Sequence, residues 1–422
     1  MVQAMRSMRD VLPQEARSFR AVEEAFRSVL CRFGYEEVQL PVLEFTELFA
    51  RGVGESTDIV EKEMYTLNDR DGDSLSLRPE GTAGCVRALN ENGLLYNQTQ
   101  RVFYSGPMFR YEKPQRGRYR QFTQIGAECF GFAGPDVDAE LILLCHEFWQ
   151  AMGIAQGVRL EINTLGSSAA RAAYRQALVD YLTPLRGELD ADSQRRLESN
   201  PLRILDSKDE RTQAIVAEAP VLESFIDDQG LAHFAQLQDH LKALGVPFVV
   251  NPTLVRGLDY YTHTVFEWIT TELGAQGTVC GGGRYDGLVE KLGGKPTPAA
   301  GFGMGLDRVV LLYEALNPDR ADSAVDVYIC LTEADMMPMA QAVARSLREP
   351  AGLRVRVHMG GGALKKQMKR AAGCGAGWAI LIGAEERAED QLTVKNLLTG
   401  EQTRSATAAA IQALLDAHPG LA

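Results

Sequence analysis

The chain of 422 residues lacks three features that would each assign it to a broad class of protein. It has no excess of basic charge, because 56 Asp and Glu outnumber 44 Lys and Arg and leave a net charge of −12. It has no apolar run long enough to span a membrane, and its N-terminus lacks the apolar core of a signal peptide. Bulk charge therefore gives no sign of nucleic-acid binding, although a local basic patch stays open. We expect a cytoplasmic protein without a membrane partner.

Cysteine is sparse and irregularly spaced. The seven cysteines are odd in number, lie far apart and form no C-x-x-C pair. This pattern argues against a disulfide framework and a structural zinc site, and favours a reducing compartment. We assign no metal-ligating side chains from the sequence.

Two common nucleotide-binding motifs are also missing. Gly294-Lys295 comes nearest to a P-loop, but Pro296 follows where Ser or Thr is needed, and Val289 stands in place of the first Gly. No G-x-G-x-x-G follows a predicted strand with an acidic residue at the required distance. If ATP binds, it must lie on an antiparallel sheet with arginine clamps, because a guanidinium can neutralise two phosphate oxygens at once.

Length and charge distribution predict two domains. A single compact core rarely extends over 422 residues. From Val325 onward there are 11 Lys and Arg against 10 Asp and Glu, a net of +1, whereas the preceding part has 33 against 46, a net of −13. We place the first domain at 1–320 and the second at 325–422.

Hydrophobic periodicity predicts a strand-rich first domain with a helical insertion at about 167–245. The second domain alternates between strands and helices, as a small α/β domain does. The predicted strands are 37–40, 74–78, 101–112, 118–130, 262–268, 325–331, 354–359, 378–382 and 392–397, and the predicted helices are 16–33, 140–152, 336–347, 364–372, 408–417 and one from about 306.

The predicted antiparallel hairpin over 101–130 gathers polar side chains. Side chains alternate along a strand, so Arg110 and Glu112 share one face, and Phe122, Gln124 and Glu128 share one face of the partner strand. If the two faces coincide, this side of the sheet is a polar site, and a solvated face with scattered charges is the alternative. The opposite side is apolar and should pack, through Phe103, Phe109, Tyr111, Ile125 and Cys129.

Three further clusters carry chemistry. The run 301–310 is typical of a strand, a turn and a helix, and places Arg308 near free N–H groups that favour phosphate. In the run 254–261, Tyr260 and Tyr261 would point to opposite faces, and one could meet a ligand. In the run 77–82, the carboxylate of Glu80 and the hydroxyl of Thr82 lie on a turn that follows a predicted strand. Each cluster also has a purely structural alternative. The run 301–310 could be an ordinary start of a helix, the tyrosines could be a pair in the core, and the run 77–82 could be a capped helix start.

Together these clusters resemble the histidyl-tRNA synthetase family over nearly the whole chain. Gln39-Leu40-Pro41 is similar to motif 1 of class II aminoacyl-tRNA synthetases, 108–131 to motif 2 and 301–312 to motif 3. The more specific runs are 256–261 and 282–287, which resemble two signature peptides of the histidine enzymes. The one departure, Gly281 where Ala is more frequent, is interpreted as trivial.

The resemblance implies an α+β fold: a class II catalytic domain built on an antiparallel sheet, followed by an anticodon-binding domain. It implies a histidine–tRNA ligase that activates L-histidine with ATP and Mg²⁺ and transfers it to the 3′ end of histidine tRNA. Motif 1 is a dimer-interface element, so a homodimer is implied. The alternative is a non-catalytic paralog acting as a regulatory subunit or a histidine or tRNA sensor, which the presence of the arginines and the second domain disfavours.

The resemblance also implies residue roles. For ATP, Arg110 would bind the α-phosphate and the histidine carboxylate, Glu112 the adenine amino group and Phe122 the ring, while Arg118 and Arg308 would hold the β- and γ-phosphates. The catalytic residues would be Arg110 and Arg256. The histidine-binding residues would be Glu80, Thr82, Arg110, Gln124, Glu128, Arg256, Tyr260 and Tyr261.

Two groups are candidates for tRNA contact. Gln115 and Arg116 lie in the loop of the hairpin and could touch the acceptor stem. Lys365, Lys366 and Lys369 cluster on a short predicted helix and could meet tRNA phosphates. A solvated charged helix is the alternative for the lysines.

Overall fold

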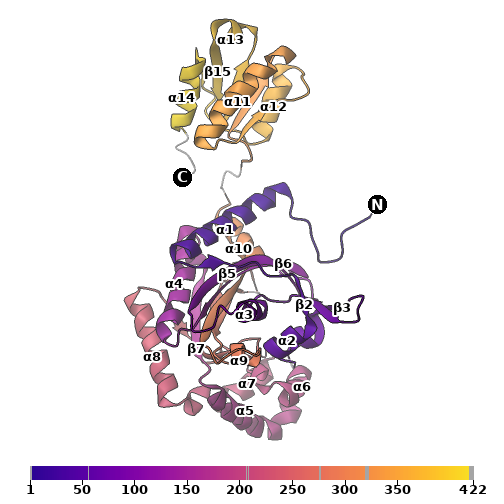
Figure 1. Ribbon diagram of the computed structural model, residues 1–422, viewed down its shortest axis with the longest axis vertical. Coiled ribbons are helices and arrows are strands. Elements are labelled where there is room, and N and C mark those ends of the chain that lie inside the picture. Colours follow the sequence, from indigo (N-terminus) through magenta and orange to yellow (C-terminus); the bar gives the residue numbers. More distant parts are fainter. Residues whose placement is uncertain are drawn as a thin grey trace. The chain divides into compact units, whose positions relative to one another are not determined.

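The computed structural model describes residues 2–55, 57–205, 207, 209–274, 277–318 and 323–417. The chain divides into two compact units, Met1–Pro318 and Asp319–Ala422 (Figure 1). None of the helices within the described ranges is both long and apolar enough to cross a membrane.

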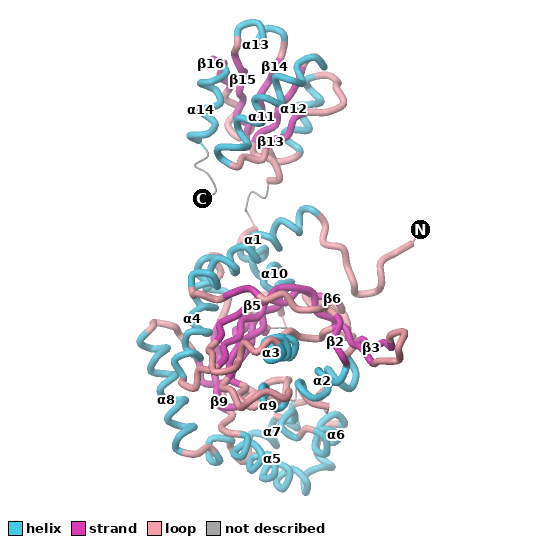
Figure 2. Tube along the Cα trace, viewed as in Figure 1, coloured by secondary structure: helices cyan, strands magenta, loops and turns pink. Residues whose placement is uncertain are grey.

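The larger unit is built on an eight-stranded sheet with the order β1-β5-β6-β11-β10-β9-β7-β8 (Figure 2). All neighbouring strands are antiparallel except the pairs at the two ends, β1 with β5 and β7 with β8. The strands are β1 Glu36–Glu37, β5 Gln100–Phe109, β6 Gln121–Phe130, β7 Arg159–Thr164, β8 Val249–Val250, β9 Thr262–Ile269, β10 Thr278–Arg284 and β11 Ala299–Gly305.

One face of this sheet is covered by helices and forms the main core. Phe26 on α1 packs edge-on against Phe148 on α4, with ring centroids 4.7 Å apart, and against Phe302 on β11 at 6.0 Å. The neighbouring positions of this core are buried and apolar. The covering helices are α1 Pro13–Arg32, α4 Pro135–Ala151, α8 Asp228–Ala243 and α10 Leu306–Leu316.

Beside the other face lie a three-stranded sheet, of order β2-β4-β3, and several short helices. Their elements are β2 Leu43–Phe45, α2 Thr46–Val53, a π-helical turn at Ile59–Glu63, β3 Tyr65–Asn68, β4 Ser74–Leu77, α3 Thr82–Glu91 and α9 Leu288–Lys291.

The helical insertion leaves the sheet after β7 and returns to it at β8. It has a small core of its own around Leu178, Leu197 and Ile204, and its last helix, α8, lies against α4. Its other helices are α5 Ser168–Leu182, α6 Ala191–Ser199, α7 Glu210–Ala217 and the 3-10 turns Thr183–Glu188, Pro201–Ile204 and Leu222–Phe225.

The second unit is a five-stranded mixed sheet with the order β13-β12-β14-β15-β16. The first three strands are parallel and the last two antiparallel. The predicted α+β fold class is confirmed. The elements are β12 Val327–Leu331, α11 Met337–Ala351, β13 Val355–Val357, α12 Leu364–Gly373, β14 Trp378–Ile382, α13 Ala384–Glu389, β15 Gln391–Asn396, β16 Gln402–Ala406 and α14 Thr407–Ala417.

Several predicted elements have different bounds in the structure. The hairpin strands stop at Phe109 and begin again at Gln121, so the intervening residues form a loop, and Tyr111 is 53% exposed rather than packed. The predicted strand 37–40 shrinks to Glu36–Glu37. The glycine-rich segment before Arg284 is strand β10, and β11 runs into α10 without a turn. Neither α13 nor β16 was among the predicted elements.

Candidate active site

The site lies on the face of the eight-stranded sheet opposite the main helical cover, and its floor is made of glycine. Gly301 on β11 pairs with Glu128 on β6. A Cβ atom at Gly301 would come within 1.7 Å of Glu128 Oε2 and 2.6 Å of the Ala127 carbonyl, so a side chain there would displace the carboxylate. A Cβ at Gly281 would lie 2.6 Å from Arg256 Nη1. The missing side chain at Gly281 therefore leaves room for the guanidinium of Arg256.

The hairpin register brings the two predicted polar faces onto one side of the sheet. Val102 pairs with Glu128, and Met108 with Phe122, so even-numbered residues on both strands share a face. The pairing extends past β5, because the Arg110 N–H donates to the Arg120 carbonyl at 2.9 Å. Arg110 thus joins Phe122 and Glu128 on that side.

A buried carboxylate lies at the start of α3. Glu80 is 3% exposed, and its carboxylate accepts hydrogen bonds from the backbone N–H groups of Thr82 at 2.6 Å and Ala83 at 2.9 Å. Burial raises the pKa of Glu80, and the two N–H groups oppose that rise. These bonds cap the helix and fix the carboxylate in place.

Glu128 is the centre of a hydrogen-bond network in this half of the pocket. Its Oε1 accepts from the Thr82 hydroxyl at 2.7 Å and from the Tyr104 hydroxyl at 3.1 Å, and its Oε2 accepts from the Tyr285 hydroxyl. The side chain is fully buried. Burial raises its pKa to about 8; the charge of Glu80 acts in the same direction, while the three hydroxyl donors oppose it.

Tyr104 and Tyr285 are site residues to which the sequence analysis assigned no role. A signal existed for each. Tyr104 has the same strand parity as Arg110, and Tyr285 lies within the 282–287 signature. Both were missed because a buried tyrosine is as common in a core as in a site.

An aromatic wall closes the buried half. The rings of Tyr260 and Tyr261 have centroids 4.7 Å apart, and those of Tyr260 and Tyr285 are 5.4 Å apart. Both members of the tyrosine pair are buried, and the Arg256 guanidinium lies 5.6 Å from the centre of the Tyr261 ring.

Arg256 is held at the junction between the buried half and a more open, arginine-rich half. It forms an ion pair with Glu267 on β9, whose other oxygen accepts from the Thr278 hydroxyl at 2.8 Å. Burial opposes the charge on Arg256, but Glu267 and Tyr261 beside it raise its pKa. The guanidinium therefore remains charged at the floor of the pocket.

The open half is a cavity of about 410 Å³, a size that accommodates a small ligand. Arg110 Nε donates to the Pro79 carbonyl at 2.8 Å, and its guanidinium lies 5.4 Å from the centre of the Phe122 ring. Arg118 Nε lies 3.1 Å from Glu112 Oε2. The predicted residues that line this cavity are Arg110, Glu112, Arg118, Phe122, Gln124, Arg256 and Arg308.

Arg308 enters the cavity from the first turn of α10. Its guanidinium donates to the carbonyl of Thr278 and to that of Gly117 at 3.3 Å. Burial, together with the nearby charge of Arg118, lowers its pKa. Five arginines thus line one cavity together with five carboxylates, and two of these arginines, Arg118 and Arg256, are ion-paired within it.

Four buried polar atoms on residues lining the cavity have no hydrogen-bond partner among the described residues: Glu112 Oε2, Arg118 Nε, Gln124 Oε1 and Arg256 Nε. The first two lie 3.1 Å apart as an ion pair, which leaves Gln124 Oε1 and Arg256 Nε. Buried polar atoms are nearly always paired in folded proteins. These two atoms therefore indicate a polar ligand at the junction of the two halves.

Arg284, from the second signature, lies outside the cavity. It is 1% exposed and donates to Asp138 at 2.6 Å and to the Phe132 carbonyl at 2.8 Å. Asp138 also pairs with His233 of α8 at 2.9 Å. Arg284 therefore fastens α4 and the insertion to the sheet.

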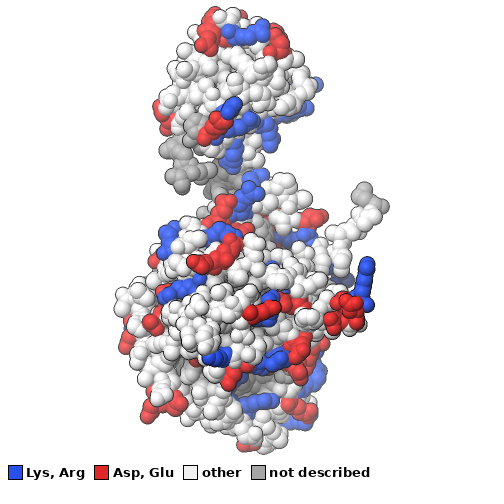
Figure 3. All heavy atoms as spheres, in the orientation of Figure 1, with Lys and Arg blue, Asp and Glu red and all other residues white. Residues whose placement is uncertain are grey.

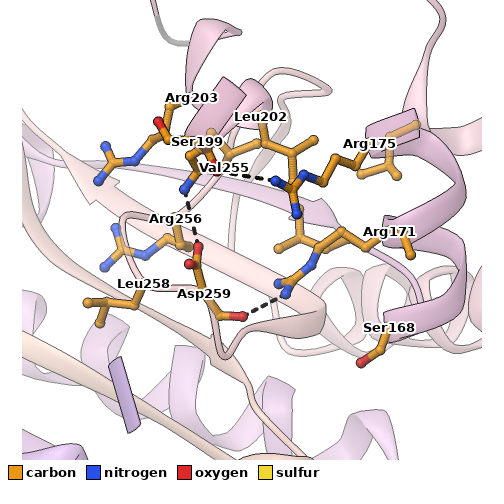
Figure 4. A pocket seen from close by; sticks show the side chains of 14 residues that line it. Ser168, Arg171, Arg175, Ser199, Leu202, Arg203, Val255, Arg256, Leu258 and Asp259 are labelled. Atoms are coloured by element: carbon orange, nitrogen blue, oxygen red, sulfur yellow. Dashed lines mark hydrogen bonds between the residues drawn. The ribbon is translucent and has the colours of Figure 1, made fainter. Parts of the chain in front are cut away.

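A second cavity, of about 230 Å³, lies between the insertion and the loop 254–261 (Figure 4). Arg171, Arg175 and Arg203 from the insertion line it, as do Arg256 and Asp259 from the loop. Both cavities share Arg203 and Arg256.

The candidate tRNA residues lie outside both cavities. Gln115 and Arg116 are in the loop between β5 and β6. Lys365, Lys366 and Lys369 are exposed on α12 in the second unit. On the face of the larger unit drawn in Figure 3, basic and acidic side chains are interspersed.

Comparison with known proteins gives consistent matches along the chain. A family model described as Histidyl-tRNA synthetase matches residues 7–309, and one described as Anticodon binding domain matches residues 326–417. A protein of Marinomonas sp. (strain MWYL1) named Histidine--tRNA ligase is 55% identical over 404 residues, which is 95% of this chain and 95% of that protein.

Solved structures agree with these matches. Apo S. aureus histidyl-tRNA synthetase is similar with a TM-score of 0.79 at 33% identity, over 98% of this chain and 100% of that one. Histidyl-tRNA synthetase from Nostoc sp. PCC 7120 is similar with a TM-score of 0.73 at 20% identity, over 98% and 99% of the two chains. The second likeness concerns the fold alone.

Proposed function

The chain belongs to the histidyl-tRNA synthetase family, and from its pocket we propose how it carries out the reaction of a histidine–tRNA ligase. Histidine is first activated with ATP to histidyl-adenylate and is then transferred to the 3′ end of histidine tRNA. The observation that carries the residue assignment is the junction at Arg110 and Arg256, where a buried carboxylate pocket meets an arginine-rich cavity.

The buried half is assigned to the histidine side chain. An imidazole presents one N–H donor and one acceptor nitrogen when neutral, and two donors when charged. Glu80, Glu128 and the tyrosine pair, which are all buried, supply acceptors and hydroxyl groups. An analogue lacking a ring nitrogen would leave one of these groups buried and unpaired, so the site is selective. Thr82 and Gln124 complete the set.

The open half is assigned to ATP. Phe122 stacks on the adenine ring and Glu112 accepts from its amino group, while Arg118 and Arg308 hold the outer phosphates. The convergence of arginines supports this assignment, because a planar guanidinium binds phosphate oxygens bidentately.

Arg110 and Arg256 act on the reacting atoms. A carboxylate oxygen of histidine attacks the α-phosphorus, and the bond to the leaving pyrophosphate breaks. Two guanidinium groups that are already in place neutralise the charge that develops, so catalysis is positioning and electrostatic stabilisation. We assign no protein nucleophile. In the second step, a ribose hydroxyl of the tRNA attacks the activated carbonyl.

Mg²⁺ would enter with the nucleotide. Within the described ranges there is no group of three or more His, Cys, Asp or Glu side chains placed to hold a metal. Mg²⁺ normally needs only one or two carboxylates beside the substrate phosphates and keeps several waters. Glu267 lines the cavity and fits that limited role, and the ion would neutralise phosphate charge there.

The tRNA assignment rests on position and charge. Lys365, Lys366 and Lys369 on α12 lie in the unit that matches the anticodon-binding family and would contact tRNA phosphates. Gln115 and Arg116, in a loop beside the ATP cavity, would contact the acceptor stem.

A homodimer in the cytoplasm is the assembly that we propose. The small sheet exposes apolar side chains, with Leu43 at 43%, Phe45 at 60% and Leu67 at 43% exposure. Apolar side chains clustered on one surface mark an interaction site. This cluster follows the Gln39-Leu40-Pro41 element that resembles motif 1.

The decisive experiment is ATP–pyrophosphate exchange with the purified chain and each amino acid in turn. We expect exchange with histidine and background rates with all others. Exchange with another amino acid would overturn the assignment of the buried half, and exchange with none would favour a regulatory role.

A further inference from the structure

The loop 254–261 carries Arg256 and the tyrosine pair but contains no helix or strand. Its backbone groups must therefore find partners elsewhere. From one side, the N–H of Asp259 donates to the carbonyl of Val53 at the end of α2, at 3.2 Å. The position of the loop thus depends on neighbouring elements rather than on its own secondary structure.

From the other side, the helical insertion binds three alternate carbonyls of the loop. Arg171 on α5 donates to the carbonyls of Asp259, at 2.6 Å, and Tyr261. Arg203 donates to the Gly257 carbonyl at 3.2 Å. Figure 4 shows Arg171 and Arg203 reaching the loop from separate segments of the insertion.

A side-chain bond and apolar packing reinforce this contact. Asn200, which follows α6, donates to Asp259 Oδ1 at 3.3 Å. Tyr174 on α5 and Leu222 belong to the same buried cluster as Leu254 and Tyr260. The insertion therefore contacts the loop through both hydrogen bonds and apolar packing, although the insertion lies outside the sheet.

We propose that Arg171, assisted by Arg203, is a positioning residue for the histidine half of the site: the insertion sets the geometry of the loop that presents the tyrosine pair. The proposal rests on the assignment of that pair to histidine. Arg171 is suited to this task because its planar fork reaches two carbonyls at once.

The position of Arg256 depends less on the insertion. Its guanidinium is fixed independently by Glu267 on β9. Loss of the Arg171 bonds should therefore loosen the tyrosine pair more than the guanidinium. The expected signature is a larger change in histidine KM than in ATP KM.

The test compares Arg171→Met with Arg175→Met in the full chain. Arg175 is the matched control, because it lies one helical turn away on α5, lines the same cavity, and donates to the Ser199 carbonyl inside the insertion. In ATP–pyrophosphate exchange we expect Arg171→Met to raise the histidine KM at least 10-fold and the ATP KM less than threefold. Arg175→Met should stay within twofold of the parent for both.

A second readout does not depend on activity. Hydrogen exchange measured by mass spectrometry should be faster across the loop 254–261 in Arg171→Met and unchanged there in Arg175→Met. Arg171→Lys retains a shorter donor and should restore part of the histidine KM. A role limited to general stability would not separate the two substrates or respond to this conservative change.

Equal histidine KM values and equal loop exchange in the two methionine variants would overturn the proposal. A parallel rise in both KM values would also overturn it. If Arg171→Met does not fold, Arg171→Lys is judged by the same criteria, and Arg203→Met, at a residue that also lines the open cavity, is judged by loop exchange alone. If the parent chain shows no histidine-dependent exchange, it is the residue assignment under Proposed function that fails, and the loop-exchange comparison still decides whether the insertion positions the loop.

Discussion

The two halves of the pocket are prepared for their ligands in opposite ways. In the histidine half, Glu128 is fully buried and its oxygens already accept three hydrogen bonds from hydroxyl groups. In the nucleotide half, the Arg118 side chain is 39% exposed, pairs with Glu112, and shares a more open cavity with four other arginines. Under the proposed assignment, an imidazole ring that must be distinguished from its analogues would meet a buried, hydrogen-bonded site, whereas the polyanionic nucleotide would meet a more open cavity.

The largest effect should follow from Arg256→Ala, which removes the residue shared by both halves. We expect histidine-dependent exchange to fall by about 10³-fold, the upper range for one preorganised donor. Folding should survive, because Glu267 keeps its bond from Thr278. Arg175→Met is the control, because Arg175 lines only the second cavity, and it should stay near the parent activity. Near-normal exchange in Arg256→Ala would show that Arg256 is not needed for activation and does not link the two halves.

Next comes Glu128→Gln, which tests the rigid half alone. The amide keeps the shape of the carboxyl group, but an NH₂ donor replaces one acceptor oxygen and the side chain cannot ionise. We expect kcat/KM for histidine to fall about 100-fold, close to 3 kcal/mol, with little change in ATP KM. Steady-state exchange measures both. An increase in ATP KM as large as the loss of kcat/KM for histidine would mean that the two halves do not bind their ligands independently.

The pH dependence of stability sharpens the same contrast. Burial raises the pKa of Glu128 from 4.5 to about 8, so between these values the folded chain keeps a proton that the unfolded chain releases. The free energy of unfolding of the parent, relative to Glu128→Gln, should therefore decrease as pH rises through this window, by roughly 1.4 kcal/mol per pH unit. Urea unfolding of both proteins without ligands at pH 5 to 8 measures the difference. A difference that does not vary with pH would contradict a buried, protonated carboxyl.

Phe122→Leu should disturb only the open half. The leucine keeps an apolar contact but not a stacking surface, so we expect ATP KM to rise about 10-fold, consistent with roughly 1–3 kcal/mol for a base stacked on an aromatic ring. Histidine KM should stay within twofold. An equal shift in both constants would show that the two ligands share this wall.

The smallest effect on chemistry is expected from reversing charge at Lys365, Lys366 and Lys369. tRNA charging at low tRNA concentration should slow several-fold, and the dependence on salt should weaken, because contacts to phosphate displace counterions. Pyrophosphate exchange should not change. The same rate of charging as the parent would count against tRNA contact at α12.

The polar face of the hairpin could be predicted from the sequence, but the strand that packs beside it could not. Alternation along 101–130 correctly grouped Arg110 with Phe122 and Glu128, because a strand has only two faces. Nothing in that segment indicates that Gly301 supplies the space for Glu128, since the pairing of β6 with β11 joins residues far apart in the chain. The docking of Arg171 was equally hidden, because a basic residue on an amphipathic helix usually faces solvent.

The order of strands in the sheet has a consequence for how the chain acquires its site. β6 has β5 as one neighbour, which directly precedes it in sequence, but its other neighbour is β11, which begins only at Ala299. On the ribosome, the Glu128 edge of the β5–β6 hairpin must wait for most of the larger unit to be synthesised before it is covered. Pairings of such long sequence separation form slowly and leave strand edges exposed meanwhile. We therefore expect aggregation during synthesis to be favoured in this interval, while the β6 edge is uncovered.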